Sequence, residues 1–373
     1  MTKIILPQQT IGIIGGGQLG QMMALSAKEM GFVVGILDPT TNCPASQVAD
    51  WHIKAAYDDS KAIEKLVAKS DVVTYEFENV DAEVLVKCTE LGKLPQGLEL
   101  LKISQNRKHE KSFLSQLNLP TAPYEIINNQ DELKNGIDSL GYPSVLKTCS
   151  GGYDGKGQVV IKHEKDIKSA TSLLHFGECV LEKWLTFEKE ISVIVSGSSH
   201  SQFEVFPIAE NRHQNNVLHT SLIPADILED CESQAKKMAK KIAKNLQIKG
   251  TITVEMFVTK NGGLIINEMA PRPHNSGHYS IEACNVSQFD SHIRGICGWP
   301  LPKVILHQSS IMMNLLGEEA NRAKEWINQK PEWNFHYYGK KEVKDGRKMG
   351  HITILSNSLE RTLEEINQTN IWK

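Results

Sequence analysis

The stretch Gly250–Met269, "GTITVEMFVTKNGGLIINEM", decides how the centre of the chain folds. Two apolar runs flank the pair Asn261-Gly262, which is the preferred dipeptide of a two-residue type I′ turn. The stretch therefore predicts a β-hairpin in which Lys260 pairs with Gly263.

Counting outward from this turn places Glu255 directly opposite Glu268 on one face of the hairpin. Two facing carboxylates repel each other, and the arrangement makes sense if a divalent cation lies between them. Hard oxygen ligands of this kind suit Mg²⁺ that is shared with substrate phosphates, so we predict that these two residues bind magnesium. A turn at Gly262-Gly263 is the alternative, since it would offset the two glutamates onto separate solvated rungs.

The loop that follows the hairpin, "NEMAPRPHNSGHY" (Asn267–Tyr279), is rich in groups that bind anions. Arg272, His274 and Asn275 present a guanidinium, an imidazole and an amide, a set suited to a small oxyanion. His274 and His278 have the spacing of paired metal ligands on a helix, but the proline and glycine around them make a helix improbable, so we set zinc aside. A polar surface loop is the alternative.

A third candidate is the glycine-rich stretch "LKTCSGGYDGKGQVVIK" (Leu146–Lys162). Its glycines predict a loop whose backbone N–H groups cradle phosphates, and Lys147, at the end of a predicted strand, would reach the same phosphates. The spacing is not that of a Walker A motif. A glycine-rich hairpin without a ligand is the alternative, because such loops alone are weak evidence.

The segment "VLEKWLTFEKEISV" (Val180–Val193) predicts strands with a linker between them. We interpret the part from Glu182 to Leu185 as an edge strand and linker that contact adenine through backbone and apolar groups. Glu190 would then hold the ribose hydroxyls. Taken alone, the segment is simply an amphipathic strand.

Near the C-terminus, "YYGKKEVKDGRKMGH" (Tyr337–His351) contains an Asp-Gly pair that predicts a second type I′ turn. Counting outward pairs Lys344 with Arg347 and puts both on one face with Lys340. Such a cluster of cations would bind a phosphomonoester. Runs of charged residues usually form a solvated surface, so the alternative is that this cluster binds no ligand.

The N-terminal stretch "IGIIGGGQLGQ" (Ile11–Gln21) has glycines in G-x-G-x-x-G spacing after an apolar run, and a second apolar run ends in Asp38. Read alone, this pattern indicates a dinucleotide-binding domain and an NAD-dependent dehydrogenase. Nothing after Asp38 supplies a hydride-transfer site. We therefore expect the N-terminus of the following helix to serve as an anion site without any NAD.

The secondary-structure pattern divides the chain into three units. Residues 1–103 alternate strands and helices, which predicts a doubly wound, Rossmann-like parallel sheet. Residues 104–300 predict a two-part centre of short strands and amphipathic helices, and residues 301–373 a small strand-rich unit that closes with a helix. The predicted fold class combines α/β and α+β.

Composition narrows the function further. The 373 residues carry a formal net charge of −3, which gives no global field for nucleic acid or an anionic membrane. The seven cysteines form no C-x-x-C pair, which favours reduced thiols in a cytoplasmic protein. We recognise neither a signal peptide at the N-terminus nor an apolar segment of the roughly 20 residues that span a bilayer.

Together, "KTCSGGYDGKGQ", "EKWL", "EISVIV", "TVEMF" and "INEMAPRPHNSGHYSIEAC" resemble the ATP-grasp superfamily. With "GIIGGGQLGQMM", "TYEFENV" and "YGKKEVKDGRKMGH" added, nearly the whole chain is similar to the N5-carboxyaminoimidazole ribonucleotide synthetases of purine biosynthesis. The resemblance implies an ATP-dependent carbon–nitrogen ligase that uses Mg²⁺. Its substrates would be ATP, bicarbonate and 5-aminoimidazole ribonucleotide, and a homodimer fits the family.

The resemblance also implies a role for each candidate residue. Phosphates, adenine and ribose of ATP would be bound by Arg107, Lys147, Gly152, Tyr153, Asp154, Gly155, Lys156, Gly157, Gln158, Glu182, Lys183, Trp184, Leu185, Glu190, His213, Asn267 and Glu268. Mg²⁺ would be bound by Glu255 and Glu268. The ribonucleotide would be bound by Gly17, Gln18, Glu76, Tyr153, Asp154, Lys156, Arg272, Lys340 and Arg347. The catalytic residues would be Lys147, Asp154, Arg272, His274 and Asn275.

In the implied reaction, bicarbonate attacks the γ-phosphate of ATP to give carboxyphosphate and ADP, and the exocyclic amine of the ribonucleotide is then carboxylated. Asp154 is the candidate to orient that amine or accept its proton. Another ATP-grasp ligase, such as a formate-dependent glycinamide ribonucleotide transformylase or a biotin carboxylase, is the nearest alternative. A nucleotide sensor without turnover and the dehydrogenase are alternatives from other classes.

Overall fold

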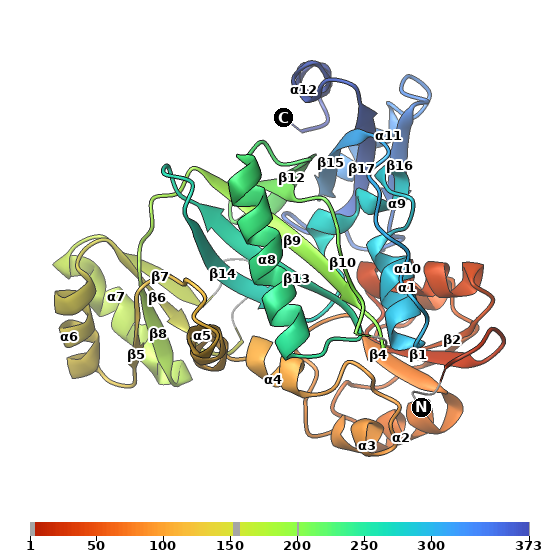
Figure 1. Ribbon diagram of the computed structural model, residues 1–373, viewed down its shortest axis with the longest axis horizontal. Coiled ribbons are helices and arrows are strands. Elements are labelled where there is room, and N and C mark those ends of the chain that lie inside the picture. The colour runs from red at the N-terminus through yellow and green to blue at the C-terminus, as the bar shows by residue number, and fades with distance from the viewer. Residues whose placement is uncertain (1–3, 152–156, 200, 373) are drawn as a thin grey trace.

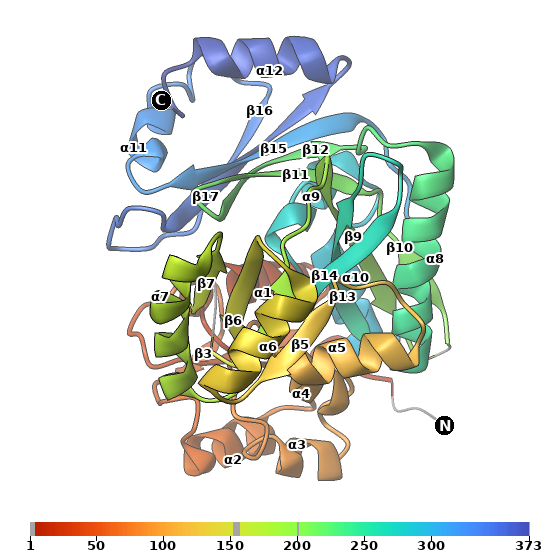
Figure 2. The same cartoon turned by 90° about the vertical axis from the view of Figure 1, so that its left-hand side faces the viewer.

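The structure is a computed structural model that describes residues 4–151, 157–199 and 201–372 (Figure 1). Its strands form three sheets: a parallel N-terminal sheet, a small antiparallel sheet and a large antiparallel sheet. Helices α2 and α3 lie at one end of the molecule, and α12 lies at the other (Figure 2). The predicted combination of α/β and α+β architecture is confirmed.

The N-terminal sheet has the strand order β3-β2-β1-β4, and its paired strands run parallel. Both faces are covered, since Ile11 and Ile13 pack against α1 and α10 while Ile14 packs with residues of α2 on the other side. This burial explains the continuous apolar runs of the strands. The elements are β1 (Thr10–Ile14), α1 (Gln18–Glu29), β2 (Val33–Leu37), η1 (Ala45–Gln47), β3 (Trp51–Ile53), α2 (Ser60–Lys69), β4 (Val72–Tyr75), α3 (Val86–Glu90) and α4 (Glu99–Ser104).

The small sheet follows, with the strand order β5-β8-β6-β7. Strand β8 lies inside this sheet between β5 and β6, so the prediction of an edge strand at Glu182 is wrong. Its alternating apolar residues pack against α6 and α7. The elements are α5 (Arg107–Gln116), β5 (Tyr124–Ile127), α6 (Gln130–Leu140), β6 (Ser144–Thr148), β7 (Gln158–Ile161), η2 (Glu164–Asp166), α7 (Ile167–Thr171), η3 (Ser172–Phe176) and β8 (Cys179–Lys183).

The large sheet has the order β14-β13-β9-β11-β12-β15-β17-β16, with β10 paired to β9. The chain segment that forms the first half of this sheet has the elements β9 (Lys189–Gly197), β10 (Phe203–Val205), β11 (Ala209–Gln214), β12 (Val217–Ile223), α8 (Glu229–Asn245), β13 (Gly250–Val258), β14 (Leu264–Ala270), η4 (Asn275–Gly277), α9 (Ser280–Ala283) and α10 (Gln288–Ile296). The segment that forms the second half has the elements β15 (Ser309–Leu316), α11 (Glu319–Lys324), β16 (Trp333–Tyr337), β17 (Lys348–Ser356) and α12 (Leu359–Gln368).

The C-terminal strands continue the central sheet, because β15 pairs with β12 from Thr220–Met313 to Ile223–Ser310. The strands expected after residue 300 are therefore present, but the boundary at 300/301 does not separate two sheets. Strands β11 and β12, which carry this connection, were not predicted. Their mixed polar and apolar sequence gives little periodic signal.

The central hairpin forms, but its turn is not the predicted one. Thr259 pairs with Gly263, and the Gly262 N–H donates to the carbonyl of Thr259 at 2.9 Å, which leaves a three-residue loop. Gly262 has φ 75°, whereas a type I′ turn would need positive φ at Asn261 as well. The longer loop shifts the register by one residue.

A β-bulge then removes this shift. Met256 pairs with Ile266 and Glu255 pairs with Glu268, so Asn267 is the extra residue between them. The predicted opposition of the two glutamates is confirmed, although it arises from a three-residue loop and a bulge rather than from a two-residue turn.

The second predicted hairpin is shorter than expected. Pairing between β16 and β17 ends at Tyr337–Gly350, and only Gly346 of the Asp-Gly pair has a positive φ, 68°. The type I′ turn and the Lys344–Arg347 ladder pair are therefore wrong: the Arg347 N–H donates to the Lys344 carbonyl within a turn of an irregular loop. Lys344 forms an exposed ion pair with Glu342.

Candidate active site

A cleft of about 620 Å³ lies between the small sheet and the large sheet. A cavity of this size is typical of sites that enclose a ligand as large as a nucleotide. Side chains from both sheets and from the loop after β14 line it. The predicted residues along its wall are Gln18, Arg107, Lys147, Gln158, Glu182, Lys183, Trp184, Leu185, Glu190, His213, Glu255, Asn267, Glu268, Arg272, His274 and Asn275.

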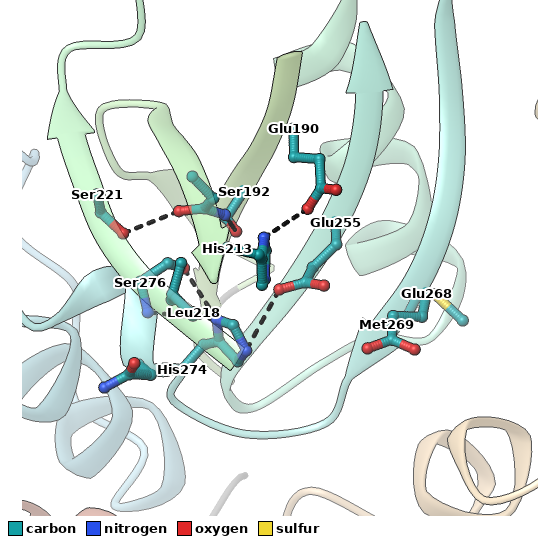
Figure 3. Close-up of polar contacts among 12 residues, drawn as sticks. Glu190, Ser192, His213, Leu218, Ser221, Glu255, Glu268, Met269, His274 and Ser276 are labelled. Atoms are coloured by element: carbon teal, nitrogen blue, oxygen red, sulfur yellow. Dashed lines mark hydrogen bonds and ion pairs between the residues drawn. The ribbon is translucent and has the colours of Figure 1, made fainter. Parts of the chain in front are cut away.

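The two glutamates of the hairpin lie on this wall (Figure 3). Burial and the nearby charge of Glu268 raise the pKa of Glu255 to about 8. Glu255 Oε1 lies 3.3 Å from His274 Nε2, and Glu268 Oε2 lies 3.4 Å from Arg107 Nη2. A divalent cation would relieve the repulsion between the carboxylates, so the pair fits Mg²⁺.

Two carboxylates are an incomplete coordination shell for Mg²⁺, which prefers six oxygens. In the described part of the chain, no group of three or more His, Cys, Asp or Glu side chains is arranged to hold a metal ion. The remaining ligands would have to come from substrate phosphates and water, as is usual for magnesium in phosphoryl-transfer sites.

Lys147 reaches the cleft from the end of β6, as predicted, but it has a partner that the sequence did not reveal. Its Nζ lies 2.8 Å from Glu182 Oε2, and Lys111 Nζ lies 2.9 Å from Glu182 Oε1. Burial disfavours the charged carboxylate, but the two lysines outweigh it and lower the pKa of Glu182 to about 2. The side chain of Glu182 is therefore committed to lysines, and only its backbone remains available for an adenine contact.

Glu190 and His213 face each other across neighbouring strands β9 and β11, with Glu190 Oε2 2.7 Å from His213 Nδ1 (Figure 3). Burial lowers the pKa of His213, but the contact with Glu190 outweighs it and the net shift is upward. Beside them, Phe187 and Phe257 stack with ring centroids 4.3 Å apart and add an apolar wall. Neither phenylalanine was predicted as a site residue, although both lie in quoted stretches of the sequence.

The anion-binding loop after β14 is held rigidly. His274 Nδ1 accepts the Ser276 N–H at 3.3 Å, so Nε2 carries the proton and donates toward Glu255. Asn275 exchanges amide hydrogen bonds with Asn314 of β15, at 3.0 and 2.5 Å. The loop is therefore fixed to β13 on one side and to the C-terminal strands on the other.

Arg272 makes a bidentate ion pair that was not predicted. Its Nε and Nη2 donate to the two carboxylate oxygens of Glu78, at 2.6 and 3.1 Å. Burial disfavours the charge of Glu78, but Arg272 outweighs burial and lowers the pKa of this carboxylate. Glu78 comes from the N-terminal unit and lines the cleft, in the quoted stretch "TYEFENV". The residue predicted from this stretch is Glu76, two positions earlier.

Glu76 contacts the N-terminus of α1. Its carboxylate accepts the N–H groups of Gly17 and Gly20 at 2.5 and 2.6 Å, and Asp38 accepts the N–H of Gly16 at 2.7 Å. A carboxylate of the chain therefore already satisfies two N–H groups at this helix N-terminus, while Gln18 and Leu19 of the first turn line the cleft. The binding of a substrate anion at this helix N-terminus remains a prediction. Asp38 is buried behind the glycines, which also removes the ribose contact of the dehydrogenase alternative.

Two predicted phosphate ligands lie outside the cleft wall but close to each other. Lys340 Nζ donates to the Lys348 carbonyl at 2.7 Å, and Arg347 donates to the Glu342 carbonyl at 2.9 Å. Burial, together with the charge of Arg347, lowers the pKa of Lys340 to about 8. Lys348, which was not predicted, lines the cleft itself.

The glycine-rich loop is described only at its two ends. Gly152, Tyr153, Asp154, Gly155 and Lys156 lie outside the described residues, so their predicted roles remain predictions. Gln158 pairs with Lys147 across β6 and β7, and the Gly157 carbonyl accepts the Thr148 N–H at 2.9 Å.

Comparison with known families gives the class first. Residues 112–289 match the ATP-grasp domain family, residues 8–105 the ribonucleotide synthetase preATP-grasp domain family, and residues 310–365 the phosphoribosylaminoimidazole carboxylase C-terminal domain family. The chain is thus an ATP-grasp protein with the two flanking domains of ribonucleotide synthetases.

Individual relatives narrow this class. The N5-carboxyaminoimidazole ribonucleotide synthase of Bacillus subtilis is 48% identical over 370 residues, which cover 99% of this chain and 97% of the relative. The ADP complex of an N5-carboxyaminoimidazole ribonucleotide synthetase superposes with a TM-score of 0.97 at 52% identity, covering 100% of this chain and 99% of the other. The chain belongs to the N5-carboxyaminoimidazole ribonucleotide synthase family.

A more distant structure shows which ligands a member can hold. The enzyme from Aspergillus clavatus, in complex with ADP and 5-aminoimidazole ribonucleotide, superposes with a TM-score of 0.91 at 30% identity over 98% of each chain. In the described part of the present chain, no helix has the length and apolar character needed to cross a bilayer.

Proposed function

We propose that the protein carboxylates the exocyclic amine of 5-aminoimidazole ribonucleotide, using ATP and bicarbonate, and releases N5-carboxyaminoimidazole ribonucleotide, ADP and phosphate. The observation that carries this proposal is the pairing of Glu255 with Glu268 in a cleft that also holds Arg107 and Lys147. The family relationship supplies the substrate class. The protein would act in purine biosynthesis in the cytoplasm.

Glu255 and Glu268 would bind Mg²⁺, with Asn267 beside them. The ion would neutralise charge on the β- and γ-phosphates of ATP. Lys147 and Arg107 would contact the same phosphates as positive point charges. Because the transferred group carries its charge on oxygens, the main contribution of these residues is positioning and electrostatic stabilisation.

Bicarbonate would be bound by Arg272, His274 and Asn275. His274 is buried beside Arg272, and both effects hold the pKa of its imidazole well below the usual range, so the ring is a neutral donor at Nε2. Glu78 orients the Arg272 guanidinium through two hydrogen bonds. Bicarbonate would attack the γ-phosphorus of ATP, releasing ADP and forming carboxyphosphate.

The ribonucleotide would lie between the N-terminal unit and the C-terminal loop. Lys340 and Arg347 would bind its phosphate, and Gln18 and Glu76 would lie near its ribose. Asp154, Tyr153 and Lys156 remain proposed ligands on the basis of the family resemblance. The amine would attack the activated carboxyl carbon, lose its proton and displace phosphate. The proposed units are residues 1–103, 104–300 and 301–373, and the protein would act as a homodimer.

The test is an ADP-release assay with purified protein. Release should require bicarbonate and be strongly stimulated by 5-aminoimidazole ribonucleotide, with the carbamate product detected by transfer of label from bicarbonate. Stimulation by formate and glycinamide ribonucleotide instead would reassign the substrate. Binding of ATP without any release of ADP would indicate a nucleotide sensor.

A further inference from the structure

Lys111 is a lysine in an unusual place. Its side chain is 1% exposed, and Nζ lies 2.9 Å from Glu182 Oε1. Among the described residues it has no aligned hydrogen-bond partner. A charged amine that is removed from water and compensated mainly by one ion pair is costly to bury. We therefore infer that Lys111 acts through its positive charge rather than by stabilising the fold.

The charge matters because Glu182 has two lysine partners. Glu182 is 4% exposed and lies between Lys111 and Lys147, with 2.8 Å to the latter. Alone with Lys147, this carboxylate would neutralise it in a one-to-one pair. With Lys111 present, the three side chains together keep a net charge of +1. Of the two lysines, Lys147 is the one that lines the cleft.

Helix α5 carries Lys111 into this position. Four residues earlier, Arg107 contacts Glu268, and Glu110 accepts the Met269 N–H at 2.6 Å. Residues three and four apart share a helix face, so one face of α5 contacts both the metal-binding strand and the Glu182 pair. The N-cap Asn106 fixes the start of this helix by accepting the N–H groups of the next turn.

We propose that Lys111 is a positioning residue for nucleotide binding: it neutralises Glu182, so that the charge of Lys147 remains available to the phosphates of ATP. This inference rests on the proposed function of Lys147 as a phosphate ligand. It predicts that substitution of Lys111 weakens the binding of ligands that carry phosphates and leaves the affinity for adenosine unchanged.

The experiment measures the dissociation constants of ADP and adenosine by titration calorimetry or competition. Lys111→Met removes the charge at similar length and should weaken ADP binding by about tenfold or more, the effect of a unit charge acting within a protein. Adenosine binding should change less than twofold. Lys111→Arg keeps the charge and should bind ADP within a few-fold of the wild type.

The double variant Lys111→Met/Glu182→Gln distinguishes charge from packing. It removes both buried charges and leaves Lys147 with its own, so ADP affinity should return toward that of the wild type. It also guards against misfolding, because Lys111→Met alone leaves Glu182 without its second partner. Lys108→Met is the matched control: Lys108 lies on the same helix, paired with Glu178 at 2.8 Å, and is 44% exposed. ADP affinity should be unchanged in it.

Three results would overturn the proposal. They are ADP binding within twofold of wild type in Lys111→Met, an equal loss of ADP and adenosine binding in that variant, and a folded double variant that binds ADP no better than the single one. A wild-type protein that binds neither ATP nor ADP would instead contradict the proposed function itself.

Discussion

Glu255 and Glu268 face each other across the central hairpin. Burial, and after it the charge of the opposite Glu268, raises the pKa of Glu255 to about 8. Such an arrangement is unfavourable in an empty cleft and favourable around a cation. The pair is therefore better explained by ligand binding than by stability.

Glu268→Gln should abolish ADP release while leaving the fold intact, because the amide keeps the shape but removes one of the two anionic ligands. We expect a fall in kcat of at least about a hundredfold, the effect typical of losing one electrostatic contact in a transition state. The assay is ADP release at saturating Mg²⁺, with the thermal midpoint as a check on folding. Glu204→Gln, on β10, is the control, and retained activity in Glu268→Gln would remove the metal argument.

Lys340→Ala should raise KM for 5-aminoimidazole ribonucleotide far more than KM for ATP. The reason is that the ammonium group of Lys340 is proposed to bind the phosphate of the ribonucleotide. A rise of at least about tenfold is expected for a charge-assisted contact. Lys344→Ala provides the control, because Lys344 lies in the same loop but pairs with Glu342 at 2.7 Å. Equal changes in both KM values would show that the loop is not the phosphate site.

At this scale the sequence predicted the members of the site better than their partners. The opposition of Glu255 and Glu268 followed from counting, although two deviations, the loop and the bulge, had to cancel. Lys111 and Glu78 could not be found in this way. Their contacts join segments that are distant in the chain, and only the tertiary fold brings those segments together.

At the scale of elements, helix α10 joins the central sheet to the N-terminal sheet through a buried histidine. His292 Nδ1 accepts the Thr251 N–H at 3.1 Å, and its Nε2 lies 2.9 Å from the hydroxyl of Thr74 on β4. Thr74 donates in turn to Gln96, whose amide donates to the Pro271 carbonyl beside the active-site loop. Every ring nitrogen is thus used in the neutral form of the histidine.

This network makes stability depend on pH. Burial lowers the pKa of His292 to about 3, while an unfolded histidine has a pKa of about 6.5. The unfolded state therefore binds more protons between these values, so the contribution of His292 is complete above about pH 6.5 and is lost as the pH falls toward 3. At pH 5 the loss is about 2 kcal/mol of unfolding free energy.

His292→Gln should unfold at a lower temperature than the wild type at pH 7 but lose less of its thermal midpoint between pH 7 and pH 5, because it removes one histidine that must be charged on unfolding. Differential scanning calorimetry across this range measures both quantities. His175→Gln, which changes an exposed histidine on η3, should keep the wild-type dependence. A steeper dependence in His292→Gln would contradict the assignment of His292 as a buried neutral group.

For the whole molecule, the cleft depends on all three sheets, since its wall takes Gln18 from the N-terminal unit, Lys147 from the small sheet and Lys348 from the C-terminal strands. The sequence predicted the parallel sheet and the central hairpin from apolar periodicity. It did not predict that β12 and β15 pair, because such long-range pairing leaves no local signal. The C-terminal region therefore looked more independent than it is.

The continuity of the sheet predicts how the chain responds to truncation. Removing residues 301–373 would expose the edge of β12 and the apolar face that includes Leu222, which packs in one core with Ile311 and Ile352. An exposed, unpaired strand edge favours association with other chains. The truncated protein should therefore aggregate or lose its cooperative unfolding transition, although the proposed boundary at 300/301 leaves every residue of the Mg²⁺ and ATP sites in place. Calorimetry and analytical ultracentrifugation would measure this, with the full chain as the control. A monodisperse 1–300 fragment that unfolds in one sharp transition and binds ADP like the full chain would show that the C-terminal strands are dispensable for the central sheet.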